Sequence, residues 1–252
     1  MNTKPRILFW DIETSPVLAW VWGYYDQNVL GIVEDSHLLS IAYKWDGDKD
    51  VTFLRKSLSK GNDAALVKQV WRLLDEADYV IAHNGDKFDQ KKANTRFLHY
   101  KLGLPSAYVQ IDTLKEYRRH FNMPSYKLNE IAKFLQLGGK VQHAGFALWL
   151  GCMANDEASW AKMKEYNLHD VALLEEVFNE LRPYSGHPGV ASAPANMQQW
   201  TGLSTCTKLG CGSPNIIKRG THRTKANVFQ TYQCADCKGY SRALIADDGR
   251  LR

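Results

Sequence analysis

The stretch Ile-Leu-Phe-Trp-Asp-Ile-Glu at residues 7–13 constrains the fold more than any other part of the chain. It is apolar enough to form a buried strand, yet it carries two carboxylates, Asp11 and Glu13. Because alternate side chains of a strand point to the same face, both carboxylates should leave one side of a sheet. Two ionised acids held together there are costly unless a cation lies between them, and a divalent metal ion is the simplest one. The alternative is one acid exposed beyond the strand and the other hydrogen-bonded.

Hydrophobic periodicity predicts an α/β layer fold with a mixed five-stranded sheet flanked by helices. The expected strands lie at residues 6–13, 38–45, 51–55, 80–83 and 109–111. The expected helices lie at residues 62–76, 88–102, 112–121, 128–135 and 155–182. Asn62 and Asp63 are predicted to cap the first helix, and Asp112 is predicted to cap the third. The aromatic segment 18–26 is expected to be an irregular loop over the site.

Two further acids occupy strand and helix ends. Asp89 follows the apolar strand 80–83 and lies in the first turn of a helix, where by itself it would be a helix cap. Tyr166 and Asp170 are four residues apart, so they share one face of the closing helix. That face is otherwise apolar and points into the core, where Asp170 needs a partner; it is either a satisfied buried acid or joined to the first strand's carboxylates through a cation.

The order and spacing of these residues resemble the four-acid signature of the DnaQ-like 3′–5′ exonucleases of the ribonuclease H-like superfamily. The matching motifs are Asp-Ile-Glu-Thr at 11–14, Asn-x-x-x-Phe-Asp ending at Asp89, and Tyr-x-x-x-Asp from Tyr166 to Asp170. Tyr166 identifies the tyrosine subtype, because the histidine subtype would have His where Glu165 stands. The segments at 112–114 and 125–129 also resemble the exonuclease domains of family B DNA polymerases. The resemblance covers roughly residues 5–182.

This resemblance implies a phosphodiesterase that uses two Mg²⁺ or Mn²⁺ ions held by Asp11, Glu13, Asp89 and Asp170. Asp11 would bridge both ions, Glu13 and Asp170 would hold the ion on the nucleophile side, and Asp89 would orient the other through water. Tyr166 would position the attacking water, since its ordinary pKa near 10 makes it a poor base at neutral pH. Thr14 and Asn84 are expected to contact the substrate strand.

Four cysteines near the C-terminus define a second module. Cys206 and Cys211 are separated by four residues, and Cys234 and Cys237 by two. Two such pairs flanking a hairpin-length insert are typical of a zinc ribbon with one structural Zn²⁺, and a disulfide is the alternative. A small-residue linker with two prolines precedes this module, so the predicted domains are residues 1–183, a linker at 184–200 and residues 201–252.

The net charge is unevenly distributed. From Thr201 onward there are nine Lys and Arg against three Asp and Glu, whereas residues 1–200 carry a net charge of −1. A basic module beside a nearly neutral body favours a polyanionic partner, most simply DNA. Its expected substrate-binding residues are Arg219, Arg223, Lys225 and Tyr232. The alternative is a ribbon that docks proteins, for instance those of replication or repair.

The leading hypothesis is therefore a 3′–5′ DNA exonuclease with a zinc ribbon. The alternatives are an RNA exonuclease, an endonuclease on branched DNA, a transposase-like enzyme, and a nucleic-acid-binding protein with a vestigial site. The Asp-x-Glu pair of the first strand and the Tyr-x-x-x-Asp motif count against the transposase. No apolar run reaches the roughly 20 residues of a membrane span, and no signal peptide precedes the first strand, so we expect a cytoplasmic protein.

Overall fold

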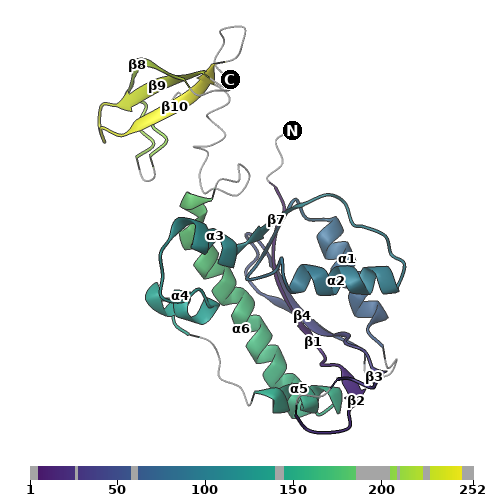
Figure 1. The fold of residues 1–252 in the computed structure, drawn as a ribbon. Coiled ribbons are helices and arrows are strands. Elements are labelled where there is room, and N and C mark those ends of the chain that lie inside the picture. Colours follow the sequence, from purple (N-terminus) through teal and green to yellow (C-terminus); the bar gives the residue numbers. More distant parts are fainter. Residues whose placement is uncertain are drawn as a thin grey trace. The chain divides into compact units, whose positions relative to one another are not determined.

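The computed structural model describes residues 5–25, 28–57, 62–139, 145–185, 205–208, 211–223 and 228–245. The chain forms two compact units, Met1–Leu181 and Arg182–Arg252, and each is described by itself (Figure 1). Within the described residues, no helix combines the length and apolar character needed to cross a membrane.

Unit 1 is built on the mixed five-stranded sheet that the sequence predicts. The strands follow the order β5-β4-β1-β6-β7, with bounds Thr52–Arg55, Leu38–Trp45, Ile7–Thr14, Tyr79–Ala82 and Val109–Asp112. Strand β1 is central: it pairs antiparallel with β4 and parallel with β6. Its ladder with β4 shifts register between Glu13 and Thr14, at the end where the acids stand.

Helices cover both faces of this sheet (Figure 1). The bounds of α1 to α6 are Ala64–Asp75, Asp89–His99, Thr113–His120, Leu128–Phe134, Phe146–Met153 and Glu157–Leu181. Leu8, Trp10 and Ile12 belong to the core cluster that contains α1 and α2 residues. Phe9 points the other way and meets Phe178 of α6 edge-to-face at 5.6 Å between ring centroids. Odd-numbered residues of β1 therefore face α6, and these include both acids.

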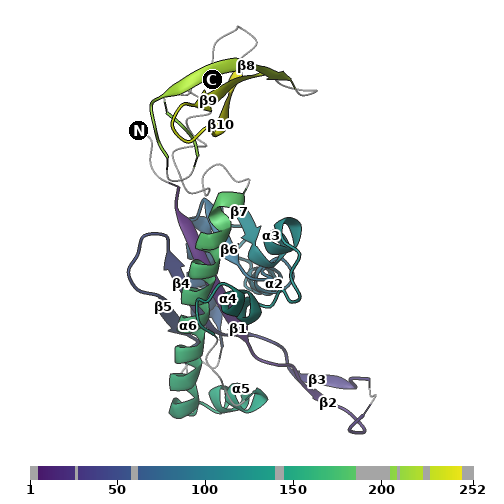
Figure 2. The same ribbon diagram turned by 90° about the vertical axis from the view of Figure 1, so that its left-hand side faces the viewer.

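The segment predicted to be a loop over the site instead begins a β-hairpin. Strand β2, Leu18–Trp20, pairs antiparallel with β3, Gly31–Glu34. Figure 2 shows this hairpin projecting away from the sheet and its helices. Many of its apolar side chains are exposed, as the tip residues Trp22 and Tyr24 at 87% and 99% exposure illustrate.

Two local features differ from the sequence prediction. Helix α5 was not predicted. At the start of α1, Asn62 does accept a hydrogen bond from the backbone N–H of Ala64 at 3.2 Å, but the Asp63 side chain makes no capping bond. Asp63 lies inward instead, where Arg96 of α2 and Tyr100, the residue after α2, bind it. The pairing of Asp63 with this distant cation replaces the local helix cap.

The described part of unit 2 is a three-stranded antiparallel sheet in the order β10-β9-β8. Its strands are Tyr240–Ile245, Val228–Cys234 and Ile216–Arg223. Tyr232 and Ala243 form its small core, with Ile216 packed against them. The first residues of the unit form a single 3-10 turn, Arg182–Tyr184. Most of the predicted linker, residues 186–200, lies outside the described residues.

Candidate functional site

Asp11 and Glu13 are each contacted by a side chain from the α5–α6 layer. The Asn167 amide of α6 donates to Asp11 Oδ2 at 2.8 Å. The Trp149 indole of α5 donates to Glu13 Oε2 at 3.2 Å. The alternation along β1 thus brings both carboxylates to one face, as predicted, and that face is covered by α5 and α6.

Asp89 reaches β1 from the opposite direction, through the tight connection between β6 and α2. Asn84 adopts the left-handed conformation (φ 62°), which asparagine tolerates. A Cβ on Gly85 would lie 2.5 Å from that of Ala82, so only glycine fits there. The Asp89 carboxylate then accepts a hydrogen bond from the backbone N–H of Ile12 at 3.1 Å. Asp89 is therefore attached to β1 between the positions of the two acids.

Asp112 holds this connection in place. It caps α3 through the Leu114 N–H at 3.0 Å, which confirms its predicted role as a cap. It also accepts hydrogen bonds from the backbone N–H groups of Asn84 at 2.9 Å and Asp86 at 3.3 Å. This one side chain ties the end of β7 to the loop that presents Asp89.

Burial makes Asp89 electrostatically unusual. Its side chain is only 2% exposed, and desolvation raises its pKa to about 7, with the negative charge of Asp112 adding to the rise. The Ile12 N–H acts in the opposite direction but does not compensate. A carboxyl with such a pKa is about half protonated near neutrality, and an approaching positive charge favours its ionised form.

Tyr166 and Asp170 lie one turn apart on α6. Burial and the carboxylates of Asp170, Glu13 and Asp11 raise the pKa of Tyr166 far above its ordinary value, and its hydroxyl hydrogen-bonds to Asp170. The Tyr166 hydroxyl is therefore neutral, and the charges of three of the predicted acids act on it. A neutral phenol at this position can orient a water molecule and cannot accept its proton.

Sequence reasoning missed the residues that support the acids. Ser40 of β4 donates to Asn167 Oδ1 at 2.7 Å, and Asn167 in turn donates to Asp11, so a buried relay links β4, α6 and β1. Ser40 and Asn167 are both fully buried. The sequence signal for Ser40 is that it is a polar residue in an apolar strand. The signal for Asn167 is that it lies on the core-facing stripe of the helix, directly after Tyr166 of the motif.

The cysteine module gathers its ligands more tightly than the acidic site does. In the part of the chain that the structure describes, the cysteine set is the one group of potential ligands close enough to hold an ion, with all four Sγ atoms within 4.8 Å of one another. Among the described residues, the predicted acids Asp11, Glu13, Asp89 and Asp170 do not form a second group of this kind.

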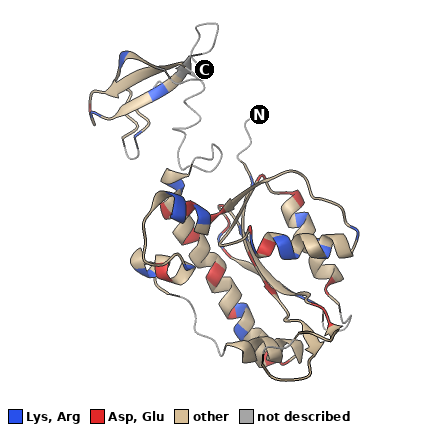
Figure 3. Cartoon of the chain, viewed as in Figure 1, with Lys and Arg blue, Asp and Glu red and all other residues tan. Residues whose placement is uncertain are grey.

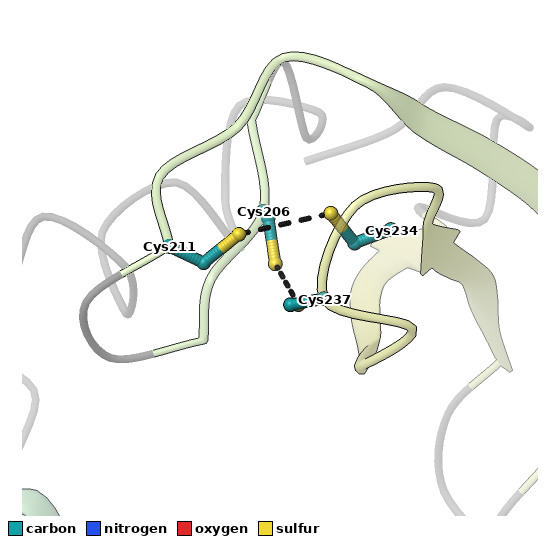
Figure 4. A group of neighbouring side chains, drawn as sticks. All are labelled: Cys206, Cys211, Cys234 and Cys237. Carbon is teal, nitrogen blue, oxygen red and sulfur yellow. Dashed lines mark hydrogen bonds between the residues drawn. The ribbon is translucent and has the colours of Figure 1, made fainter.

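The four Sγ atoms fit a tetrahedral metal site (Figure 4). Cys206 and Cys237 are 3.5 Å apart, and Cys211 and Cys234 are 3.8 Å apart. Zn–S bonds of about 2.3 Å place the sulfurs of a tetrahedron roughly 3.8 Å apart. A disulfide would require about 2.05 Å, so the thiols are not paired as disulfides. These residues can bind one metal ion.

Backbone N–H groups point at two of the cysteine sulfurs. The Lys208 N–H points at Cys206 Sγ (3.5 Å) and the Gly239 N–H at Cys237 Sγ (3.4 Å). The Cys237 N–H lowers the pKa of the Cys234 thiol to about 7, whereas desolvation raises the pKa of the Cys206 thiol to about 12. Metal binding to this set therefore releases protons.

The predicted substrate-binding residues of unit 2 differ in their surroundings. Arg219 lies on β8 and donates to Gln233 at 3.0 Å on the exposed surface. Tyr232 is only 4% exposed in the ribbon core, so its ring has no face for a base to stack on. Arg223 ends β8 and its side chain is not described, and Lys225 lies outside the described residues.

Comparison with known proteins gives a family match and a fold match. A sequence model described as the RNase_H superfamily matches residues 8–182. Among solved structures, the family B DNA polymerase from the hyperthermophilic archaeon Pyrobaculum calidifontis is similar at a TM-score of 0.53 and 18% identity. The similarity covers 78% of this chain and 28% of the polymerase, so the chain corresponds to less than a third of that protein. No curated protein matches the sequence.

Proposed function

The chain belongs to the RNase H superfamily, and from this premise we propose that unit 1 is a metal-dependent 3′–5′ exonuclease acting on DNA. One observation carries the proposal. Asp89 hydrogen-bonds to the backbone between Asp11 and Glu13, while Tyr166, bonded to Asp170, lies in the field of both β1 acids. These contacts support the proposal that acids from three distant parts of the chain converge on the end of β1.

The donor set fits hard divalent cations. Carboxylate oxygens and water are the ligands that Mg²⁺ and Mn²⁺ favour, and the proposed ligands are Asp11, Glu13, Asp89 and Asp170. When bound, two such ions supply an activated water and neutralise charge on the phosphoryl oxygens. Ionisation of Asp89, whose pKa is raised to about 7, would accompany their binding.

The chain's own residues then carry defined tasks. Asn167 holds Asp11, and Trp149 holds Glu13, each through one hydrogen bond. The neutral Tyr166 hydroxyl orients the attacking water toward phosphorus. In the reaction the water oxygen forms a bond to phosphorus, the bond from phosphorus to the 3′-oxygen breaks, and that oxygen leaves with a proton.

Two observations favour a DNA 3′ end over the alternatives. The motif Tyr-x-x-x-Asp and the segments at 112–114 and 125–129 resemble those of family B polymerase exonuclease domains. A solved structure with a similar fold is a DNA polymerase. Thr14 and Asn84, at the end of β1 and in the loop before Asp89, flank the acids and are the proposed contacts to the substrate strand.

For unit 2 we propose a zinc ribbon that helps to hold nucleic acid. Four thiolates at tetrahedral spacing favour Zn²⁺ over harder cations. Arg219, Arg223 and Lys225 remain its proposed phosphate contacts, and Tyr232 is left out because it is buried. Binding to replication or repair proteins is the alternative role.

The decisive experiment uses end-labelled oligonucleotides with Mg²⁺ or Mn²⁺, resolved on a gel. We expect a ladder that shortens single-stranded DNA from its 3′ end, and a loss of about 10³-fold or more in Asp11→Asn or Asp170→Asn. Tyr166→Phe should slow the reaction by a smaller factor. Glu165→Gln is the matched control, because this exposed residue lies on the same helix and its partner among the described residues is Lys162.

The other outcomes separate the alternatives. Internal cuts would favour an endonuclease, faster loss of RNA would favour an RNA exonuclease, and full activity in Asp11→Asn would exclude the assigned site. For unit 2, Cys234→Ser should remove one zinc per chain, measured by elemental analysis, and weaken DNA binding with a smaller salt dependence. Unchanged DNA affinity after zinc loss would favour the protein-docking role.

A further inference from the structure

Two cavities adjoin the end of β1, next to Glu13. The first, about 560 Å³, is lined by Pro16 and Val17 and by Phe146 and Trp149 of α5, and is called the aromatic cavity. The second, about 250 Å³, is lined by Lys87, Lys91 and Lys92 at the start of α2, and is called the lysine cavity. Thr14, Ser36 and Lys92 line both, so the two cavities are adjacent.

The lysine cavity carries uncompensated positive charge. Among the described residues, no carboxylate pairs with Lys87, Lys91 or Lys92, and the Lys92 ammonium donates to Ser36 Oγ at 3.1 Å. Asp35 is the one acid that lines the cavity, and Arg96 is already held by Asp63. Basic residues of α2 are visible in Figure 3. Three ammonium groups with hydroxyls beside them are suited to a phosphodiester backbone.

The aromatic cavity is held beside the acids. The hydrogen bond from Trp149 to Glu13 fixes the indole at the cavity wall, and Phe146 is 59% exposed at the same wall. A volume of about 560 Å³ lies within the range of small-molecule sites and accepts an aromatic ring system. A base can enter such a cavity only after it has left a double-helical stack.

The β2–β3 hairpin begins at the edge of the aromatic cavity. Val17 lines the cavity, and β2 starts at the next residue. Trp20, Trp22, Tyr24 and Tyr25 then follow, with exposures of 69, 87, 99 and 83%. Exposed aromatic rings beside a basic groove are the arrangement by which proteins stack successive bases of a single strand.

We propose that the aromatic cavity, the lysine cavity and the β2–β3 hairpin form one binding surface for single-stranded nucleic acid. One unstacked base occupies the aromatic cavity, backbone phosphates contact Lys91 and Lys92, and further bases stack on the hairpin. This inference rests on the proposed nuclease function, for which it specifies an unpaired substrate end.

Binding to the full-length protein tests the surface without catalysis. Fluorescence anisotropy with a labelled 12-nucleotide single strand and the matching blunt duplex is measured without divalent ions. We expect tighter binding of the single strand. Lys91→Glu with Lys92→Ala should weaken it about tenfold and reduce the slope of log affinity against log salt by about 1.4. Phe146→Ala and Trp20→Ala with Trp22→Ala should weaken it about tenfold each, with the salt slope unchanged.

Matched controls isolate the surface. Lys68→Glu reverses a charge on the exposed face of α1, and Phe134→Ala removes an exposed aromatic of α4, both outside the cavities. Both should bind like the wild type. Since turnover is absent, the result stands whether or not Asp11 and Asp170 catalyse hydrolysis.

Two results would overturn the proposal. In one, the duplex binds at least as tightly as the single strand, and the cavity variants bind like the controls. The other is a Trp20→Ala, Trp22→Ala variant whose oligomeric state changes by light scattering while its oligonucleotide affinity does not. That result would assign the hairpin to a protein contact instead.

Discussion

Asp63 and Asp89 are both buried aspartates of unit 1, with exposures of 0% and 2%, yet their surroundings are opposite. Asp63 accepts hydrogen bonds from Arg96 at 2.6 and 2.8 Å, Tyr100 at 2.6 Å and the Leu38 N–H at 2.8 Å. Burial raises its pKa, but these partners outweigh burial and hold the pKa below its usual value. Asp89 accepts the Ile12 N–H, no basic side chain among the described residues pairs with it, and its pKa rises to about 7.

The difference separates a structural acid, Asp63, from Asp89, which we propose as a metal ligand. The fold supplies Asp63 with its own cation, so its charge is complete when the chain has folded. Asp89 is buried to a similar extent, but no such cation pairs with it among the described residues. It lies beside the end of β1, which also carries Asp11 and Glu13. A buried carboxyl that the fold leaves without a counter-charge is suited to bind a cation from solution.

The largest expected effect is that of replacing the structural acid, Asp63. Asp63→Asn should lower the free energy of unfolding by about 3–5 kcal/mol, because it leaves the largely buried Arg96 guanidinium without its counter-charge. Urea denaturation followed by tryptophan fluorescence reports on unit 1, since seven of the eight tryptophans precede residue 182. The difference should shrink in strong acid, as the pH falls through the lowered pKa of Asp63. A loss below about 1 kcal/mol would remove the contrast between the two acids.

Asp89→Asn should have the opposite sign. Between the unfolded pKa near 3.9 and the folded pKa near 7, the folded wild type binds more protons, so its stability falls as the pH rises. Asparagine avoids this loss while its carbonyl still accepts the Ile12 N–H. The variant should be more stable than the wild type by about 2–4 kcal/mol at pH 8 and equal to it near pH 4. Destabilisation at pH 8 would make Asp89 a second structural acid.

Divalent ions should stabilise the wild type by binding at the proposed site that contains Asp89. At a Mg²⁺ concentration 100 times the dissociation constant, we expect a gain of about 2.7 kcal/mol in unit 1. Mg²⁺ is preferred to Mn²⁺ for this measurement because it binds oxygen ligands and avoids the thiols of unit 2. Asp63→Asn should keep this gain and Asp89→Asn should lose most of it. An equal gain in both variants would place the ion elsewhere.

The smallest expected effect concerns the relay that supports Asp11. Ser40→Ala removes the hydrogen bond to Asn167 and should cost about 1 kcal/mol of stability. Nuclease activity should fall by less than tenfold, since Asn167 still reaches Asp11. An activity loss as large as that of Asp11→Asn would show that Ser40 itself belongs to the reacting site.

Local patterns predicted most of the sheet, because strand alternation and turn residues act over a few positions. Strand β4 occupies the predicted residues, and the shared face of Asp11 and Glu13 follows from the period of two. Helix α5 was missed because its sequence, Phe-Ala-Leu-Trp-Leu-Gly-Cys-Met, is apolar throughout and has no period. With it, the Trp149 contact to Glu13 was missed.

The remaining differences come from contacts between distant residues. Asp63 carries the sequence signal of a cap, but Arg96 lies 33 positions away and captures its side chain. Ser40 and Asn167 are 127 positions apart, so no local pattern links them. Strands β2 and β3 pair across ten intervening residues without the two-residue turn that marks a short hairpin.

The relay from Ser40 through Asn167 to Asp11 also sets the order in which the site can be assembled during synthesis. Asp11 is translated first, but its Asn167 partner and Asp170 lie on α6, the last helix of unit 1. A nascent chain that has emerged only as far as β7 contains three of the four acids but lacks α6, which carries Asp170 and Asn167. Under the proposed function, activity on nucleic acid would therefore begin only after α6 has left the ribosome and packed onto the sheet.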